Sequence, residues 1–268
     1  MHPVLFRIGT YAVGTHDFFV FLGILAGSAV FFYEGRRRHM LNEQLVWVVI
    51  GALFGGAVGS KLSSLWSYLA AAPDPSIPQW LLAEGRSILG ALAGAYLGAV
   101  LAKRLVGYRT RTGDLFAPAV ALGMAVGRWG CFLTEQVGTP TGLPWGIRVS
   151  KEAAARIPNC PACLRGVPMH PSFLYEIAFQ AVMFGLLLWL RQRVRTPGDL
   201  FKIYLLSYGV FRFAVEFVRG NQVLWLGLTG PQLFLIPTTL LLFGYFARHR
   251  FESFRWFHRR DLEPGLAA

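Results

Sequence analysis

Two arginines lie inside stretches that are otherwise apolar enough to cross a membrane. Arg128 comes 14 residues after Asp114, and Arg212 comes 13 residues after Asp199. A charge within a membrane helix costs about 2.5–3.5 kcal/mol on insertion scales, so each arginine is a functional candidate. At about 1.5 Å per residue, both lie roughly 20 Å along their helices, at the same depth in parallel helices. Two guanidinium groups at one level predict a clamp for an anion, and the anion that a bilayer supplies is a lipid phosphate.

The composition is that of an integral membrane protein. Of the 268 residues, 54% are hydrophobic and 15% are charged, whereas a soluble domain has about a quarter charged residues. Seven stretches are long and apolar enough to span a bilayer. They cover residues 17–34, 45–70, 86–102, 114–134, 172–190, 199–218 and 230–247. The sequence predicts an all-α membrane protein, with residues 1–268 forming a single transmembrane domain of seven helices.

The net charge of +12 is distributed as membrane topology requires. Lys and Arg cluster after the first, third, fifth and seventh stretches and are sparser, or diluted in a long loop, after the others. This positive-inside pattern predicts the N-terminus outside and the C-terminus in the cytoplasm, and it argues against a nucleic-acid partner. The clusters are Arg36, Arg37 and Arg38; Lys103, Arg104, Arg109 and Arg111; Arg191, Arg193 and Arg195; and Arg248, Arg250, Arg255, Arg259 and Arg260.

The connection at about residues 135–171 is the long external loop of this arrangement. It is rich in Pro and Gly, and loops of this length are usually functional or disordered. Cys160 and Cys163 lie in it, on the side where a disulfide can form. We favour a local disulfide, because a metal site needs two further ligands and none is close in sequence. Cys131, in the fourth stretch, fits a small buried apolar residue.

Small residues recur in the second and third stretches. The segments GALFGGAVGSKLSSLW and GRSILGALAGAYLGA carry glycines and alanines at spacings that let two helices approach closely in lipid. We therefore expect close helix packing as the main role of these glycines.

Polar groups from five helices converge at the predicted outer face. Helices running outward place three cations in their outer halves, and helices running inward begin with polar residues. These residues are Lys61, Ser87, Arg128, His170, Tyr175, Glu176 and Arg212. The pattern predicts a shared polar site in a cavity bordered by the third to sixth stretches and open sideways to the outer leaflet.

Arg212, Glu216 and Arg219 are spaced i, i+4 and i+7, so they are expected on one helical face. Glu216 between two arginines would lower the cost of burying them. The guanidinium donors left over would bind phosphate, which Arg does bidentately. The alternative is an ion pair that only orients the bundle. His170 is likewise either structural or catalytic, and its position at the level of the arginines favours catalysis.

Five segments resemble motifs of the prolipoprotein diacylglyceryl transferase family, in the same order. They are GSKL at 59–62, GRWGCFLTEQVGTPTGLPWGI from Gly127, MHPSFLYE at 169–176, YGVFRFAVEFVR at 208–219 and GPQLFLIP at 230–237. The resemblance covers nearly the whole chain and implies seven helices of a multi-pass protein of the bacterial cytoplasmic (inner) membrane. It implies transfer of the diacylglyceryl group of phosphatidylglycerol to the lipobox cysteine of a prolipoprotein. The products are a thioether and glycerol phosphate, and no metal or cofactor is required.

The resemblance also assigns residues to this chemistry. Arg128 and Arg212 match the family's essential arginines, and with His170 they are the expected catalytic residues. The expected substrate-binding residues are Lys61, Ser87, Gly90, Gly138, Tyr175, Glu176, Glu216 and Arg219. The attacking thiol must become a thiolate, and the departing phosphate needs preorganised positive charge.

The chain departs from the family pattern in three places. Cys131 and Thr134 stand where the signature usually has asparagines. Leu89 stands where well-known members have a histidine, and His16 and Asp17 lie where they have a tyrosine motif. A divergent or non-catalytic lipid-binding protein of the same fold is therefore the alternative. A channel is disfavoured, because the ionisable residues gather at one level and do not line a path across the membrane.

The replacement at Leu89 leaves the identity of the general base open. His170 and His16 are the candidates, since imidazole titrates near neutrality. We favour His170, because Tyr175 and Glu176 are close enough in sequence to orient it. The alternative is that the arginines alone activate the thiol.

Overall fold

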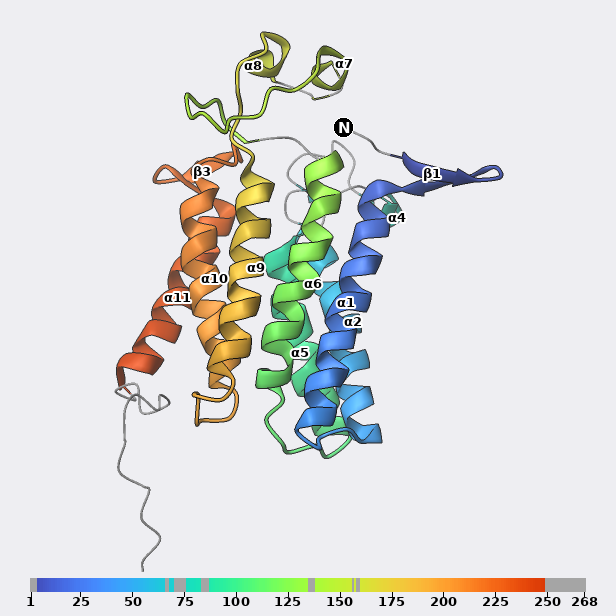
Figure 1. Ribbon diagram of the computed structural model, residues 1–268, viewed down its shortest axis with the longest axis vertical. Coiled ribbons are helices and arrows are strands. Elements are labelled where there is room, and N and C mark those ends of the chain that lie inside the picture. Colours follow the sequence, from blue (N-terminus) through green and yellow to red (C-terminus); the bar gives the residue numbers. More distant parts are fainter. Residues whose placement is uncertain are drawn as a thin grey trace, which may run out of the picture. The chain divides into compact units, whose positions relative to one another are not determined.

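The computed structural model describes residues 4–65, 68–69, 76–82, 87–134, 138–155, 157 and 160–248. Helices dominate this part of the chain, with two short hairpins (Figure 1). The elements are β1 Val4–Ile8, β2 Tyr11–Gly14, α1 Thr15–Arg37, α2 Glu43–Leu62, α4 Ile77–Leu82, α5 Ile88–Leu105, α6 Gly113–Thr134, α7 Lys151–Ala154, α8 Pro161–Leu164, α9 Ser172–Leu190, α10 Asp199–Glu216, β3 Val223–Trp225, β4 Leu228–Thr229 and α11 Gly230–Arg248.

Six helices of the described chain are long and apolar enough to cross a membrane: α1, α2, α5, α6, α9 and α11. They confirm an all-α integral membrane protein and coincide with six of the seven predicted stretches. The other stretch is α10, which also folds as a helix. It carries four charged residues, Asp199, Lys202, Arg212 and Glu216, and for this reason it is not among the six helices named above.

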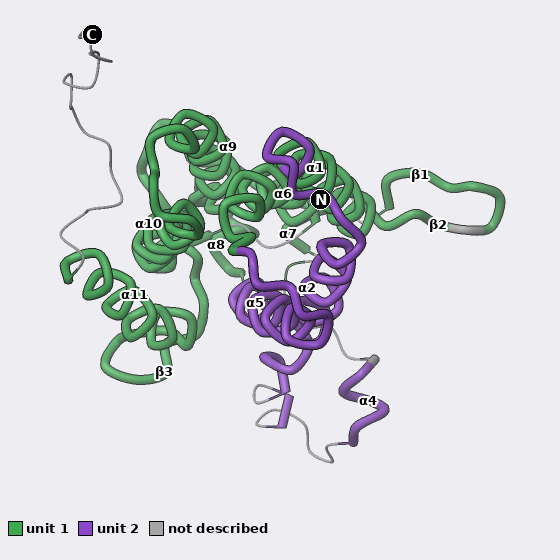
Figure 2. Tube along the Cα trace, turned by 90° about the horizontal axis from the view of Figure 1, so that it is seen from below, with its two compact units in different colours: residues 1–34, 111–268 green, residues 35–110 purple. Residues whose placement is uncertain are grey.

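The chain forms two compact units (Figure 2). One comprises residues 1–34 and 111–268, and the other comprises residues 35–110. The first unit contains α1, α6, α9, α10 and α11, and the second contains α2, α4 and α5.

In the unit of residues 35–110, α2 and α5 pack through facing glycines. A Cβ at Gly55 would lie 2.9 Å from the Cα of Gly98, and a Cβ at Gly94 would lie 2.8 Å from the Cα of Gly59. Side chains larger than hydrogen would therefore push the two backbones apart. The expected role of these glycines in close packing is confirmed.

The second stretch was predicted to continue to residue 70, and this is wrong at its end. The α2 helix stops at Leu62, and Ser63 and Ser64 form a turn. The Ser63 hydroxyl donates to the carbonyl of Ser60 at 2.9 Å, and the Ser64 hydroxyl donates to the carbonyl of Lys61 at 2.7 Å. Such local hydroxyl bonds compete with helix continuation, which hydropathy alone does not register.

In the other unit, α6 packs between α1 and the pair α9 and α10, and α11 packs on α10 (Figure 1). Glycines again allow the closest approach: a Cβ at Gly27 of α1 would lie 2.9 Å from the carbonyl oxygen of Ala119 on α6.

The starts of α6 and α10 are tied together by one carboxylate. Oδ1 of Asp114, in the first turn of α6, accepts hydrogen bonds from the backbone N–H of Gly198 at 3.0 Å and of Leu200 at 3.2 Å. These donors belong to the N-terminus of α10, whose N–H groups have no partner within their own helix. The two helices therefore start at one level and run in the same direction.

The described part of the loop that was predicted to be external, here called the external loop, folds as a small structure at the N-terminal end of α9 (Figure 1). It contains α7 and α8 and its own apolar cluster of Ala154, Ile157, Cys163 and Met169. Cys160 and Cys163 form a disulfide, as predicted. The backbone of Met169 exchanges two hydrogen bonds of 2.9 Å with Ile147, which links this small core to the adjacent His170.

Candidate active site

A fully buried carboxylate, Glu176 of α9, lies at the centre of three arginines. Nε of Arg128 lies 2.5 Å from Oε2 of Glu176, and Nε of Arg212 lies 3.4 Å from Oε1. Nη1 of Arg219 lies 3.5 Å from the same Oε1. The prediction that Arg128 and Arg212 reach the same depth is confirmed, because both contact one carboxyl group. The nearly equal distances in sequence of Arg128 and Arg212 from the tied helix starts explain why they meet.

Glu216 pairs with only one of the two arginines that the helical spacing suggested. Its Oε2 accepts from Nη1 of Arg212. Its Oε1 accepts from Asn221 at 2.6 Å and from Thr229 at 2.9 Å. The predicted pairing of Glu216 with Arg212 is confirmed, and Glu216 also acts on Arg219 through its charge, although no ion pair within 4 Å joins Glu216 and Arg219 among the described residues. The α10 helix ends at Glu216, so the i+3 rule no longer determines the position of Arg219, which turns toward Glu176.

The five charged groups of this arginine cluster leave one positive charge in excess. Three guanidinium groups face two carboxylates, Glu176 and Glu216. Nε of Arg128, Nε of Arg212 and Nη1 of Arg219 are buried and face the Glu176 oxygens as ion pairs, outside ideal hydrogen-bonding geometry. The cluster therefore has the net charge to receive one monoanion.

An aromatic ring and burial set the rest of the arginine environment. The ring of Phe173 lies 5.8 Å from the guanidinium carbon of Arg128 and 4.6 Å from that of Arg219. Burial lowers the pKa of Arg219, because desolvation disfavours the guanidinium ion, and Glu176 opposes this shift. Arginine stays protonated at physiological pH in any case. Nη1 of Arg128 also lies 3.7 Å from Sγ of Cys131, which is buried as expected.

His170 belongs to a second group of side chains at the start of α9. Its Nδ1 lies 3.1 Å from the hydroxyl of Tyr175, and that hydroxyl accepts a hydrogen bond of 2.9 Å from Nε1 of Trp145 in the external loop. Tyr175 thus orients His170, as predicted. Glu176 does not, because its carboxylate is turned to the arginines.

Gly138 joins three parts of the site by its backbone. Its N–H donates to the carbonyl of His170 at 2.9 Å, and the N–H of Thr139 donates to the carbonyl of Val218 at 2.9 Å. A Cβ at Gly138 would collide with the carbonyl oxygen of Val218 and lie 2.9 Å from that of His170. Glycine is required here for close approach between the external loop, the start of α9 and the end of α10.

The other three predicted site residues lie in the unit of residues 35–110. Nζ of Lys61 lies 5.7 Å from the ring of Trp80. Ser87 is the N-cap of α5, and its hydroxyl accepts from the N–H of Gly90 at 3.4 Å. Gly90 takes part in the α2–α5 contact, because a Cβ there would collide with Gly59 and Ser63.

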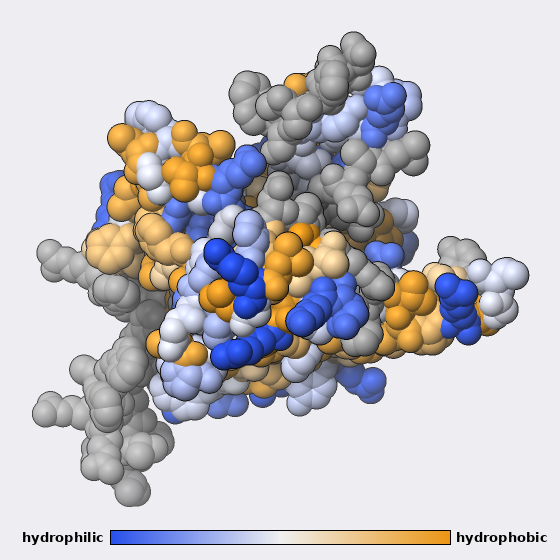
Figure 3. Space-filling model, turned by 90° about the horizontal axis from the view of Figure 1, so that it is seen from above, coloured by the Kyte–Doolittle hydropathy of each residue, from blue (hydrophilic) through white to orange (hydrophobic). Residues whose placement is uncertain are grey.

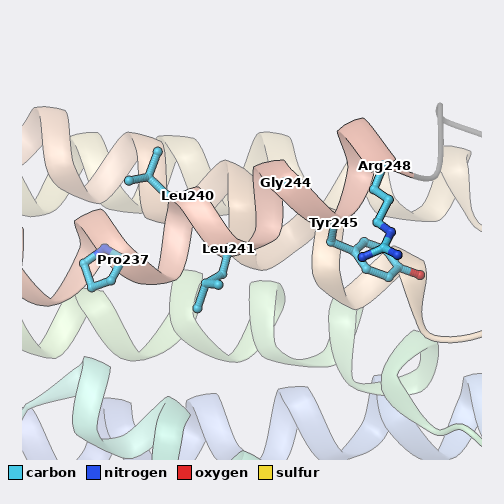
Figure 4. A pocket seen from close by; sticks show the side chains of 6 residues that line it. All are labelled: Pro237, Leu240, Leu241, Gly244, Tyr245 and Arg248. Atoms are coloured by element: carbon cyan, nitrogen blue, oxygen red, sulfur yellow. The ribbon is translucent and has the colours of Figure 1, made fainter.

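A groove of about 900 Å³ lies along α11 (Figure 4). Its lining residues are Pro237, Leu240, Leu241, Gly244, Tyr245 and Arg248. None of them belongs to the arginine cluster. The cavity predicted between the third to sixth stretches stays a prediction.

Sequence reasoning missed a buried polar layer next to the arginines. Tyr208 is buried one turn before Arg212 on α10. The hydroxyl of Tyr204 donates to Oε1 of Gln180 at 3.0 Å. The i−4 spacing of Tyr208 from Arg212 within YGVFRF was the available signal. Asn221 and Thr229 gave no such signal, because their contact with Glu216 depends on a hairpin.

Residues 3–248 match the family model described as prolipoprotein diacylglyceryl transferase. The chain belongs to this family. Three similar relatives are named phosphatidylglycerol–prolipoprotein diacylglyceryl transferase. The protein of Bordetella parapertussis is 32% identical, over 89% of this chain and 91% of its own. That of Cupriavidus pinatubonensis is 32% identical, over 98% and 94%. That of Gloeobacter violaceus is 33% identical, over 83% of each chain. The family membership inferred from the motifs is thereby confirmed.

Proposed function

We propose that this family member transfers the diacylglyceryl group of phosphatidylglycerol to the lipobox cysteine thiol of a prolipoprotein. The relatives' names specify this donor and this class of acceptor. The observation that carries the proposal for this chain is the buried arginine cluster with one excess positive charge. Phosphatidylglycerol is a phosphodiester with one negative charge, so its headgroup would complete the charge balance of the cluster.

The reaction is a substitution at the glycerol carbon that carries the phosphate. The acceptor thiolate attacks this carbon, a C–S bond forms, and the C–O bond to phosphate breaks. The electron pair of that bond leaves with glycerol phosphate. Negative charge therefore moves from sulfur to the leaving phosphate, where Arg128 and Arg212 are placed to stabilise it. Glu176 and Glu216 hold the two guanidinium groups in place before the substrate arrives.

His170 is the group that we assign to the thiol proton. The hydroxyl oxygen of Tyr175 has two lone pairs, so it can accept from Nε1 of Trp145 and also from Nδ1–H of His170. This tautomer leaves Nε2 of His170 unprotonated and able to take a proton. The alternative is that the arginines alone favour the thiolate, with His170 only fixing the loop.

We further propose the membrane arrangement that this chemistry requires. The chain is a single transmembrane domain of seven helices in the bacterial cytoplasmic (inner) membrane, with α10 as the seventh. The N-terminus lies outside and the C-terminus in the cytoplasm, as the charge distribution predicts. Lys61, Ser87, Gly90 and Gly138 are proposed to contact the lipid or the lipobox peptide.

The test is direct. The purified protein is incubated with phosphatidylglycerol vesicles and a lipobox peptide, and the products are identified by mass spectrometry. We expect a peptide carrying a diacylglyceryl thioether, together with glycerol phosphate. A peptide with Ser in place of the acceptor Cys is the matched control. Saturable binding of phosphatidylglycerol without thioether formation would refute the transferase and establish the lipid-binding alternative.

A further inference from the structure

The β3–β4 hairpin has an apolar tip, residues 223–226, which the rest of the described protein leaves exposed. Val223, Leu224, Trp225 and Leu226 are between 61% and 74% exposed. The surrounding segment GNQVLWLGLTG, residues 220–230, has no charged residue. Figure 3 shows hydrophobic side chains gathered at the edge of the molecule where this hairpin lies. Four consecutive exposed apolar residues indicate a contact surface.

The backbone conformation at the tip disfavours leucine, so the turn itself does not explain the presence of Leu226. Trp225 pairs with Leu228, so Leu226 and Gly227 form a two-residue loop. Their φ angles are 51° and 75°. Loops of this kind require positive φ at both positions and favour Asn-Gly. A bulky apolar residue is disfavoured in this conformation. Leu226, at 74% exposure, gains no compensating packing within the described chain.

The position of the hairpin identifies the bilayer as the partner. Strand β4 runs directly into α11 at Gly230, and α11 is one of the helices apolar enough to span a membrane. Only Gly227, Leu228 and Thr229 separate the tip from that helix, a reach of about 10 Å. Tryptophan is enriched at the boundary between lipid and water. The tip therefore lies within reach of the membrane surface at the end of α11 where the arginine cluster lies.

The residues at the base of the hairpin form hydrogen bonds with Glu216 of the arginine cluster. Asn221 precedes β3 and Thr229 ends β4, and both donate to Oε1 of Glu216, at 2.6 and 2.9 Å. The other oxygen of Glu216 accepts from Arg212. Gln232 fixes this base, because its Oε1 accepts from the N–H of Thr229 at 3.0 Å.

We propose that residues 223–226 insert into the membrane interface and that this insertion holds Asn221 and Thr229 on Glu216, which positions Arg212. The insertion goes beyond the proposed reaction and does not depend on it. Only the link to Arg212 rests on the proposed function. Asn221 and Thr229 are thus positioning residues that act through Glu216.

The insertion is tested with a fluorescent probe in lipid nanodiscs. The environment-sensitive dye NBD is attached to Leu226→Cys, and the unmodified protein is labelled in parallel to give the background from Cys131. Gly142→Cys is the matched control, because Gly142 is exposed and a Cβ there would meet open space. We expect the probe at 226 to be quenched by lipids brominated in the upper acyl chain and protected from aqueous iodide. The probe at 142 should show the reverse.

Equal iodide quenching at both positions would overturn the proposal. A probe at 226 that becomes protected only when a lipobox peptide is added would also overturn it and assign the tip to the precursor. Neither readout requires catalysis, so failure of the insertion and failure of the transferase reaction are distinguishable.

A second variant separates insertion from folding. Leu226→Asn suits the left-handed turn and removes the apolar side chain, so the thermal midpoint should not fall. With NBD on Leu224→Cys, this substitution should raise iodide access, and thioether formation should slow in the same nanodiscs. Unchanged iodide access would refute insertion. Raised access with an unchanged rate would refute the link to Arg212.

Discussion

Replacing Arg212 by Lys tests the view that guanidinium geometry, and not charge alone, drives the reaction. Arg212 uses Nε toward Glu176 and Nη1 toward Glu216, and its remaining N–H groups are available to the substrate. Lysine keeps the charge but offers one ammonium group, which cannot satisfy both carboxylates and also bind two phosphate oxygens. The variant should therefore lose at least one charge-assisted hydrogen bond to the departing phosphate.

The expected size of this loss follows from hydrogen-bond energies. A hydrogen bond to a charged group contributes about 1.5–3 kcal/mol. If that bond strengthens in the transition state, its loss lowers kcat roughly 10- to 160-fold. The assay is thioether formation at saturating phosphatidylglycerol, with the thermal midpoint measured to confirm folding. Arg195→Lys, at an exposed position, is the control for the same chemical change.

The outcome distinguishes two explanations. Arg219→Lys should be milder than Arg212→Lys, because Arg219 forms an ion pair with Glu176 alone, whereas Arg212 contacts both Glu176 and Glu216. If Arg212→Lys has the same kcat as the unmodified protein, the cluster acts only through its charge and the clamp mechanism is refuted. A raised KM with unchanged kcat would assign Arg212 to ground-state binding.

Three further predictions concern the carboxylate, the base and the helix packing. Glu176→Gln should destabilise the protein by about 3–5 kcal/mol, because three buried cations lose their shared partner. A thermal midpoint equal to that of Glu152→Gln, a change at an exposed residue of α7, would contradict this. His170→Ala should slow the reaction and change the pH–rate profile, with Tyr175→Phe intermediate. An active His170→Ala variant with an unchanged profile would leave the arginines as the activators. Gly94→Val should destabilise the α2–α5 pair by about 1–3 kcal/mol, whereas Gly185→Val, where a Cβ meets nothing within 4 Å, should not; equal thermal midpoints would refute close packing as the role of Gly94.

The sequence by itself determined the helices, the glycine contacts and the common level of two arginines. Membrane-spanning helices need long apolar runs, so hydropathy located them within a few residues, except where Ser63 and Ser64 end α2. The level of Arg128 and Arg212 follows from a constant rise per residue, once α6 and α10 start together. The helix positions and the level of each arginine depend on the spacing of residues along a single helix, and the sequence specifies this spacing directly.

Only the tertiary structure decided which charges meet. The rotation of α9 about its axis turns Glu176 toward three arginines, and no spacing rule along the chain specifies that rotation. Because α10 ends at Glu216, Arg219 does not lie on the helical face that its i+7 spacing from Arg212 predicted. Asn221 and Thr229 reach Glu216 only because a hairpin folds them back. Pairing between groups far apart in sequence depends on packing and burial of several elements at once, so the sequence supplied the members of the site and the fold supplied their partners.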